Sequence, residues 1–274
     1  MFVPTAKIIA DSINPNGDRL TTVVAKYHRF IHQEVLTHRV FSRNASSSRA
    51  IPVKKQIQKA MDDNVYPLHW GRNQPGMIAD VENNELIRHP ITGALVTKEQ
   101  GWNEIRLYLA AWSNAYADAN YHKQIVNRLL ESFSTITVII TATEWDNFFE
   151  QRCHPSAQPE IRAIAVAIRN AYQNSVPVPL RWGQWHLPFI ESIDHESGLL
   201  NEELIEISAA RSARVSYLNH EGKRDINKDL ELYEKLRTAT PPHLSPLEHP
   251  AKALAGQWAN LTGFQSHRWE HEQK

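Results

Sequence analysis

The 274-residue sequence has a hydrophobic fraction of 42%, which permits one large domain with a substantial core. Its 30 basic and 30 acidic side chains give zero net charge, so no global field draws the protein to DNA or to an anionic membrane. The single cysteine, Cys153, excludes an intrachain disulfide framework and fits a reducing compartment. No apolar run approaches the roughly 18 residues that a membrane span requires, and the first residues lack a signal-peptide pattern, so we expect a soluble, cytoplasmic protein.

The first predicted elements are a strand and a helix within residues 18–32. The strand is indicated by β-branched residues at positions 21–24, and helical spacing follows from about Arg29. This helix leads into the polar stretch Gln33–Pro52, which combines three arginines with a histidine, an asparagine and four serines. Arginine can grip phosphate or carboxylate with two parallel hydrogen bonds, and hydroxyls and amides add neutral donors. The stretch therefore predicts either a nucleotide cradle, a solvated basic loop or a nucleic-acid contact.

Residues 53–100 are the least regular part of the chain. Two prolines and two glycines interrupt residues 66–77, which predicts a loop that serves either as a lid over a planar ligand or as a packed structural segment. Helix formers dominate residues 98–130, with a stripe of Trp102, Ile105, Leu109 and Trp112 that we expect to face the core. Arg128 lies among apolar residues, so we expect it to have an anionic partner.

The alternation of isoleucine and valine with threonine predicts a strand over residues 134–141. Pro159 then opens a predicted helix with Ile161, Ile164 and Ile168 on one side, which ends near residue 175. Residues 177–188 are broken by prolines, as in a surface connector or a linker. A last amphipathic helix is indicated by residues 230, 233 and 236.

The histidines and the cysteine do not form a recognisable catalytic or metal motif. His28/His32 and His267/His271 have helical i,i+4 spacing, but no H-E-x-x-H or paired-cysteine pattern accompanies them, so we predict no metal site. Cys153 lies next to arginine and histidine in the sequence, but a nucleophilic cysteine needs a base placed in space. We therefore predict that Cys153 has no catalytic role.

The run His38–Arg49, H-R-V-F-S-R-N-A-S-S-S-R, resembles the H-R-x-x-S-x-N-x-x-S-x-R core of the signature of flavin-dependent thymidylate synthases. The family's signature has Arg before this core, Glu after its Asn and Tyr after its last Arg, where this chain has Thr37, Ala45 and Ala50. A second resemblance is N-F-F-E-Q-R at residues 147–152, followed by S-A-Q-P-E-I at residues 156–161. There the family also has an Asn and an Arg where this chain has Thr141 and Thr143.

A third resemblance, A-R-V-S followed by a helix and H-L-S-P-L-E-H, covers residues 213–249. The family carries this run near its N-terminus, upstream of the signature. Its late position here predicts a circular permutation, which is tolerated where termini lie close together on the surface. A partial duplication is the alternative, since residues 265–268, Q-S-H-R, echo the signature.

The resemblance implies a mixed α/β (α+β) fold with a central, mostly antiparallel sheet flanked by helices. It implies one catalytic domain over residues 1–274, with the signature in residues 1–176, an insertion at about 53–100 and the permuted segment in residues 206–274. It assigns substrate binding to Glu34, Ser47, Ser48, Arg49, Arg128 and Arg152. Catalytic roles fall on Arg152 and Ser47. The flavin contacts implied are His38, Arg39, Asn44, Asn147, His243, Ser245 and Glu248.

The activity that the resemblance implies is reductive methylation of dUMP to dTMP. Bound FAD is the cofactor, with methylene-tetrahydrofolate as carbon donor and NADPH as reductant. The family also implies a homotetramer whose sites lie at subunit interfaces, with no stable nucleic-acid partner. One alternative is an enzyme of the same scaffold that methylates or hydroxymethylates another pyrimidine nucleotide such as dCMP, because residues 34, 45, 48 and 50 differ on the substrate side. A second alternative is a non-catalytic nucleotide- or nucleic-acid-binding protein.

Overall fold

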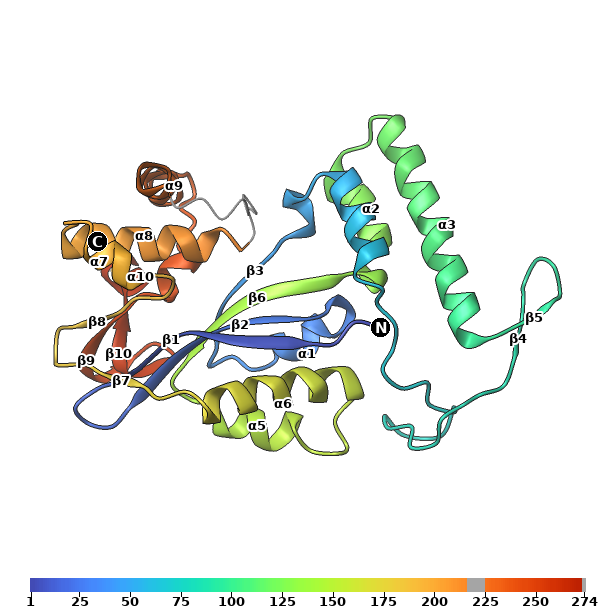
Figure 1. The fold of residues 1–274 in the computed structure, drawn as a ribbon, viewed down its shortest axis with the longest axis horizontal. Coiled ribbons are helices and arrows are strands. Elements are labelled where there is room, and N and C mark those ends of the chain that lie inside the picture. The colour runs from blue at the N-terminus through green and yellow to red at the C-terminus, as the bar shows by residue number, and fades with distance from the viewer. Residues whose placement is uncertain (216–224, 273–274) are drawn as a thin grey trace.

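The computed structural model describes residues 1–215 and 225–272, and its centre is a five-stranded sheet (Figure 1). The strands, in the order β3-β6-β2-β1-β7, are β3 (Ser42–Ala45), β6 (Thr135–Ala142), β2 (Arg19–His28), β1 (Thr5–Ile13) and β7 (Val178–Pro179). All neighbouring strands are antiparallel except β1 and β7. The predicted α/β architecture with a mostly antiparallel sheet is therefore confirmed.

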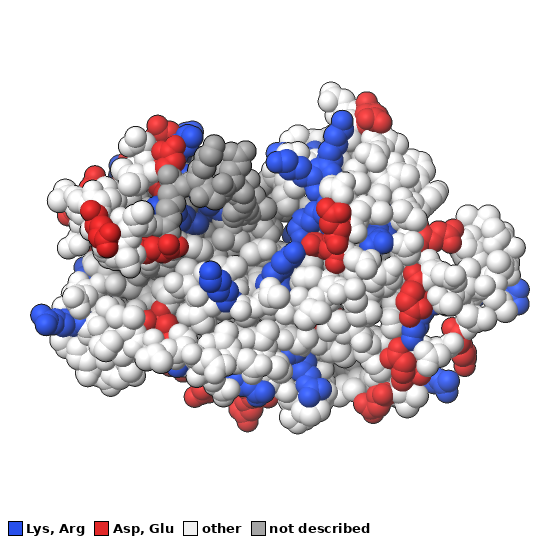
Figure 2. All heavy atoms as spheres, viewed as in Figure 1, with Lys and Arg blue, Asp and Glu red and all other residues white. Residues whose placement is uncertain are grey.

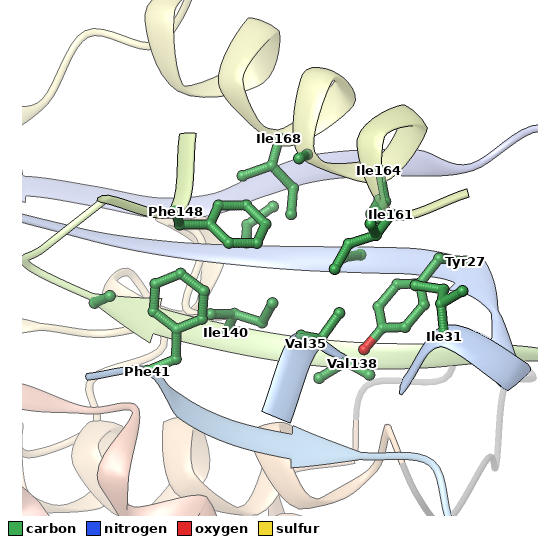
Figure 3. Packing of buried hydrophobic residues seen from close by; sticks show 14 of the residues in the cluster. Tyr27, Ile31, Val35, Phe41, Val138, Ile140, Phe148, Ile161, Ile164 and Ile168 are labelled. Atoms are coloured by element: carbon green, nitrogen blue, oxygen red, sulfur yellow. The ribbon is translucent and has the colours of Figure 1, made fainter. Parts of the chain in front are cut away.

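Two helices, α5 (Asp146–Arg152) and α6 (Pro159–Gln173), cover one face of this sheet (Figure 1). Figure 3 shows Ile161, Ile164 and Ile168 of α6 pointing into the cluster formed with residues of β2, β6 and α5. Each of these isoleucines is at most 1% exposed, so its burial stabilises the fold by about 1.5–3 kcal/mol. The predicted start at Pro159 and the predicted isoleucine face are both confirmed.

The signature stretch runs through short elements between β2 and the insertion. After β2 come η1 (Arg29–Ile31), α1 (His32–Leu36), β3 and η2 (Ser48–Ala50), followed by α2 (Val53–Asp62). The predicted strand and helix before the signature are therefore confirmed. His28 ends β2, so it does not share a helix with His32 as the i,i+4 spacing suggested.

The insertion packs at the opposite end of the sheet from the C-terminal elements (Figure 1). It contains the short hairpin β4 (Ile87–Arg88) and β5 (Leu95–Val96), followed by α3 (Lys98–Asp118), α4 (Lys123–Val126) and η3 (Asn127–Phe133). A single helix over residues 98–130 was the wrong expectation. Asn120 has a φ of 64°, a left-handed conformation that breaks the helix between α3 and α4.

The predicted core stripe of α3 is only half buried. Trp102 and Leu109 pack against a cluster that includes Ala60, Leu130 and Phe133. The same stripe's Ile105 and Trp112 are 53% and 46% exposed, because α3 contacts the rest of the protein along one side only. The loop of residues 66–77 is anchored to α6, where the Leu68 amide donates to the buried Glu160 carboxylate at 2.7 Å.

The C-terminal elements form a second layer at one end of the sheet (Figure 1). A three-stranded sheet is built from β8 (Trp185–His186), β9 (Ala251–Trp258) and β10 (Leu261–Ser266). The helices are α7 (Ser192–His195), α8 (Asn201–Ala213), α9 (Ile226–Thr238), η4 (Ser245–Glu248) and α10 (His267–Glu272). Arg211 of α8 joins these helices by pairing with Asp194 at 2.8 Å and with Asp229 at 2.9 Å. The predicted amphipathic helix is α9, with Tyr233 and Leu236 buried.

A chain of five buried polar side chains, here called the polar chain, crosses from the C-terminal layer into the central sheet. It runs Ser12–His186–Thr22–Thr141–His249, and every hydrogen bond along it is 2.7–2.8 Å long. Burial lowers the pKa of both histidines to about 3, so both rings are neutral at pH 7. The Nε2 atom of His249 is buried without a hydrogen-bond partner.

The C-terminal layer also covers the outer edge of β3. The Asn260 side chain donates to the Val40 carbonyl at 2.9 Å and to the Ser42 hydroxyl at 3.0 Å. The Asn44 side chain donates to the Ser212 carbonyl at 2.7 Å. These bonds fix the signature stretch against the last part of the chain. Residues 216 and 217 of the A-R-V-S-Y run lie outside the described residues.

In the described ranges, no helix is long and apolar enough to cross a membrane.

Candidate nucleotide site

A cavity of about 510 Å³, here called the signature cavity, lies where three distant parts of the chain meet. Its walls come from the end of β3 and η2, from the start of α4, and from the C-terminal layer. The lining residues are Asn44, Ala45, Ser47, Arg49, Ala50, Lys123, Gln124, Ala213, Leu236, His243, Ser245 and Pro246. Five of the residues singled out from the sequence, Asn44, Ser47, Arg49, His243 and Ser245, therefore lie around one cavity.

Buried polar groups form hydrogen bonds with the loop that carries Arg49. Ser47 caps η2, its hydroxyl accepting from the Arg49 amide at 3.3 Å. The Asn127 side chain donates to the carbonyls of Ser48 and Ile51 at 2.7 and 2.8 Å. Asn127 is fully buried, so these bonds are shielded from water and fix the loop. The Arg49 side chain is left exposed at the cavity.

The charge of the signature cavity favours an anion. Arg49 and Lys123 line it, whereas no aspartate or glutamate does among the residues that the structure describes. The Lys123 ammonium donates to the Ala50 carbonyl at 3.2 Å, a neutral acceptor, and it forms no ion pair with a carboxylate of the described residues. Figure 2 shows Lys and Arg side chains in the upper middle of the molecule, with Asp and Glu side chains beside them. A phosphate group is the ligand that such a pair of cations beside a serine hydroxyl binds well.

Arg128 and Ser48 meet at Glu131, close beneath the η2 loop. The Glu131 carboxylate accepts from Arg128 at 2.9 Å and from the Ser48 hydroxyl at 3.0 Å, and it pairs with Arg29 at 3.1 Å. The anionic partner predicted for Arg128 is thus Glu131. Ser48 is buried, and its hydroxyl is used inside the protein.

Arg152 and His38 form a second cluster, which does not line the signature cavity. The Arg152 Nε donates to His38 Nε2 at 2.9 Å, and its Nη2 donates to the Thr37 hydroxyl at 3.1 Å. Burial, with a further effect from Arg152, lowers the pKa of His38 to about 4, so the ring stays neutral. Its edge packs on Phe148 with ring centroids 4.9 Å apart. Both hydrogen-bond partners of Arg152 are therefore uncharged, and its positive charge remains available to a ligand.

Four further predicted residues lie away from the signature cavity. Arg39 and Asn147 are exposed. Glu34 is half buried, and one of its carboxylate oxygens is buried without a hydrogen-bond partner in the described structure. Glu248 forms an ion pair with Arg268, so its charge is compensated within the chain.

Thr141 and Thr143, which stand where the family has Asn and Arg, are used for packing between the layers. The Thr141 hydroxyl is part of the polar chain, and the Thr143 hydroxyl accepts from the Thr262 amide at 3.1 Å. Both side chains therefore join β6 and the loop after it to the C-terminal layer.

Lys123, Gln124, Asn127 and Arg29 were not singled out from the sequence. Lys123 and Asn127 are four residues apart, shortly before Arg128, and this spacing places them on one face of a helix. That spacing could have identified Lys123 and Asn127 from the sequence. No local pattern indicates that Arg29 pairs with Glu131. Cys153 is half buried, and burial raises the pKa of its thiol, which disfavours the reactive thiolate.

Comparison with known proteins identified one family model, described as thymidylate synthase complementing protein, which matches residues 19–178. Among solved structures, the chain is similar to the UMP/dUMP methylase PolB from Streptomyces cacaoi bound with 5-Br UMP. Their identity is 13% and the TM-score 0.46, over 63% of this chain and 89% of that one. It is also similar to the flavin-dependent thymidylate synthase ThyX from Helicobacter pylori complexed with FAD and dUMP. There the identity is 15% and the TM-score 0.38, over 56% of this chain and 67% of that one. No curated protein matches the chain.

Proposed function

Since the chain belongs to the thymidylate synthase complementing protein family, we propose that it catalyses the FAD-dependent reductive methylation of dUMP to dTMP. The carbon would come from methylene-tetrahydrofolate and the electrons from NADPH, giving tetrahydrofolate and NADP⁺ as the other products. The observation that carries this proposal is the signature cavity, where Asn44, Ser47 and Arg49 meet His243 and Ser245 from the other end of the chain.

The residues of the cavity suit a nucleotide monophosphate. Arg49 and Lys123 would bind the phosphate, and the Ser47 hydroxyl would add a neutral donor. Arg128, which pairs with Glu131, would add a further positive charge near the phosphate. Because Asn127 hydrogen-bonds two carbonyls of the η2 loop, the backbone that carries Ser47 and Arg49 is positioned before the nucleotide binds, which lowers the entropic cost of binding.

Arg152 would act on the pyrimidine ring. Its two hydrogen-bond partners, His38 and Thr37, are neutral, so the guanidinium can stabilise negative charge that develops on the ring during methyl transfer. The neutral His38 accepts from Arg152 and thereby orients the guanidinium, an arrangement that preserves its full charge for the substrate.

The candidate flavin residues fit the group in part within one chain. Asn44, His243 and Ser245 offer polar side chains at the signature cavity, whereas Arg39 and Asn147 are exposed elsewhere. When bound, FAD would supply the hydride that reduces the transferred carbon to a methyl group. Because Arg39 and Asn147 are exposed outside the signature cavity, the flavin site could be completed by residues of a second subunit. We propose a homotetramer for this reason.

An enzyme acting on a cytosine nucleotide such as dCMP is the second candidate. Thr37 donates to the Glu34 carbonyl at 2.7 Å and accepts from Arg152, so Glu34 lies next to the proposed ring site. A carboxylate such as that of Glu34 can accept a hydrogen bond from an amino group, which cytosine has and uracil lacks.

The contacts between the start of the chain and β10 support the proposed circular permutation. The Asn14 side chain donates to the Gly263 carbonyl at 3.0 Å, so the turn that leads into β2 lies against β10. In a chain with the family's order, the C-terminal segment would be followed directly by β2. Because the turn before β2 lies against β10, the connection between the two could be short.

The test is the visible absorbance spectrum of the purified protein, followed by turnover on dUMP and dCMP with methylene-tetrahydrofolate and NADPH. We expect bound flavin, dTMP formation and a rise in the KM for dUMP of about tenfold or more in Arg49→Ala, because a charged hydrogen bond of about 1.5–3 kcal/mol is lost. The exposed Arg181, far from the cavity in sequence, provides the control Arg181→Ala, which should match the native protein.

Colourless protein without turnover on either nucleotide would contradict the proposed activity. Turnover on dCMP alone, reduced by Glu34→Gln, would favour the second candidate.

A further inference from the structure

A second cavity, of about 620 Å³, lies between α8, α9 and α10 and differs in charge from the signature cavity. It is lined by four glutamates, among them Glu206 and Glu270, and by two cations, Arg237 and Lys252. Two histidines and a tyrosine complete its polar wall. The proposed methylation assigns no role to these residues.

The histidines His267 and His271 converge on a single point of this cavity. They are four residues apart on α10, and their Nε2 atoms lie 3.2 Å from each other. The Tyr233 hydroxyl of α9 lies 2.8 Å from the first of these nitrogens and 3.0 Å from the second. Two imidazole nitrogens bound to one zinc ion at tetrahedral angles are about 3.4 Å apart, since each Zn–N bond is about 2.0–2.1 Å long. The observed triangle is therefore close to one face of a tetrahedral metal site.

The orientation of the first ring also suits metal binding. His267 Nδ1 faces the Glu270 carboxylate at 3.3 Å, and Glu270 in turn pairs with Lys252 at 2.5 Å. A carboxylate on Nδ1 holds the proton on that nitrogen, so the lone pair of Nε2 points toward Tyr233 and His271.

Glu206 adds a further carboxylate to the wall of this cavity. It lines the cavity from α8, where Glu234 repels its carboxylate and Arg237 attracts it. With four glutamates against two cations, the cavity wall carries an excess of carboxylates.

We propose that His267, His271 and Tyr233 form a binding site for one divalent transition-metal ion of the zinc class. In the described part of the chain, no third His, Cys, Asp or Glu side chain joins the two imidazoles, and the tyrosine oxygen is the third donor. Water would complete the coordination. Imidazole ligands favour Zn²⁺, Ni²⁺ and Cu²⁺ over Mg²⁺ and Ca²⁺.

The site is connected to the signature cavity through the same elements. Tyr233 and Leu236 are three residues apart on α9, and Leu236 lines the signature cavity. The His267 amide donates to the Pro250 carbonyl at 2.9 Å, two residues beyond η4, whose Ser245 also lines that cavity. An ion that joins α9 to α10 would therefore also stabilise this wall of the signature cavity.

The experiment uses the full chain, treated with a chelator and dialysed, and titrated with Zn²⁺ by calorimetry and with Co²⁺ by visible absorption. We expect one ion per chain, d–d absorption typical of four-coordinate Co²⁺, and a rise in Tm with Zn²⁺. His267→Gln and His271→Gln should each weaken Zn²⁺ binding at least tenfold, and Tyr233→Phe should weaken it less. Mg²⁺ should not compete.

His195→Gln is the matched control, since His195 is an exposed histidine outside this cavity. It should bind Zn²⁺ like the native protein. The proposal is overturned if the chelator-treated protein binds no Zn²⁺, or if His271→Gln, shown to be folded by circular dichroism, binds Zn²⁺ as tightly as the control. In that case the triangle is only a hydrogen-bonded contact between α9 and α10.

Discussion

Thr141 joins Thr22 to His249 in the polar chain, and the substitution Thr141→Val removes its hydroxyl while keeping nearly the same shape. Two buried hydrogen bonds are lost, the one to the Thr22 hydroxyl at 2.7 Å and the one to His249 Nδ1 at 2.8 Å. Thr22 keeps its bond to His186, but His249 keeps none, because its Nε2 already lacks a partner. A buried polar group left without a partner costs about 1–3 kcal/mol, so we expect a loss of about 2–3 kcal/mol in the free energy of unfolding.

The assay is urea denaturation at pH 7.5, followed by tryptophan fluorescence and by circular dichroism. Thr137→Val is the matched control on the same strand, because the Thr137 side chain is half buried and makes no hydrogen bond that the structure shows. The midpoint should fall in Thr141→Val and stay within the equivalent of about 0.5 kcal/mol in Thr137→Val. Equal midpoints for the two variants would refute the structural importance of the polar chain.

Three further predictions concern stability. His186 and His249 have pKa values lowered to about 3, against about 6.5 in the unfolded chain, so only the unfolded state gains protons as the pH falls below 6.5. Stability is thus complete above that pH and should fall by up to about 1.4 kcal/mol per pH unit for each ring down to pH 3, as urea midpoints between pH 8 and 5 will show. Asn127→Leu removes both donors beneath η2 and should cost about 2–3 kcal/mol in urea denaturation while raising the KM for the nucleotide. Arg211→Met removes the guanidinium that pairs with the buried Asp194 and Asp229, of which Asp229 keeps Arg214 at 2.7 Å, and should cost about 3 kcal/mol, measured by thermal denaturation.

Each of these predictions has an outcome that contradicts it. A urea midpoint independent of pH between 8 and 5 would show that the folded and unfolded states take up protons equally at His186 and His249. An unchanged KM in a destabilised Asn127→Leu would separate the η2 loop from nucleotide binding. A stable Arg211→Met would mean that the two aspartates become protonated or solvated.

Elements with a strong local pattern could be predicted from the sequence. The isoleucine face of α6 and the threonine alternation of β6 follow from helical and strand periods that burial enforces. The break between α3 and α4 could not, because it depends on the left-handed conformation of Asn120, which tertiary packing selects. Likewise, no spacing rule shows which face of α3 remains exposed.

The candidate site was only partly predictable for a similar reason. The meeting of Asn44 with His243 follows from the family's motifs and not from any local pattern, since the two residues are 199 positions apart. Arg152 was expected beside the cradle, yet its contacts go to His38 and Thr37. Side-chain partners across such distances depend on how the layers pack.

The position of β3 at the border of the central sheet has a consequence for the solution behaviour of fragments. A border strand with free amide and carbonyl groups can pair with the same strand of another molecule and start aggregation. At the opposite border, β7 is short and contains Pro179, which limits such pairing. At β3 the protection comes from the C-terminal layer, through Asn260 and the Ser212 carbonyl. Proteolytic loss of that layer should therefore convert a monodisperse protein into one that self-associates through β3.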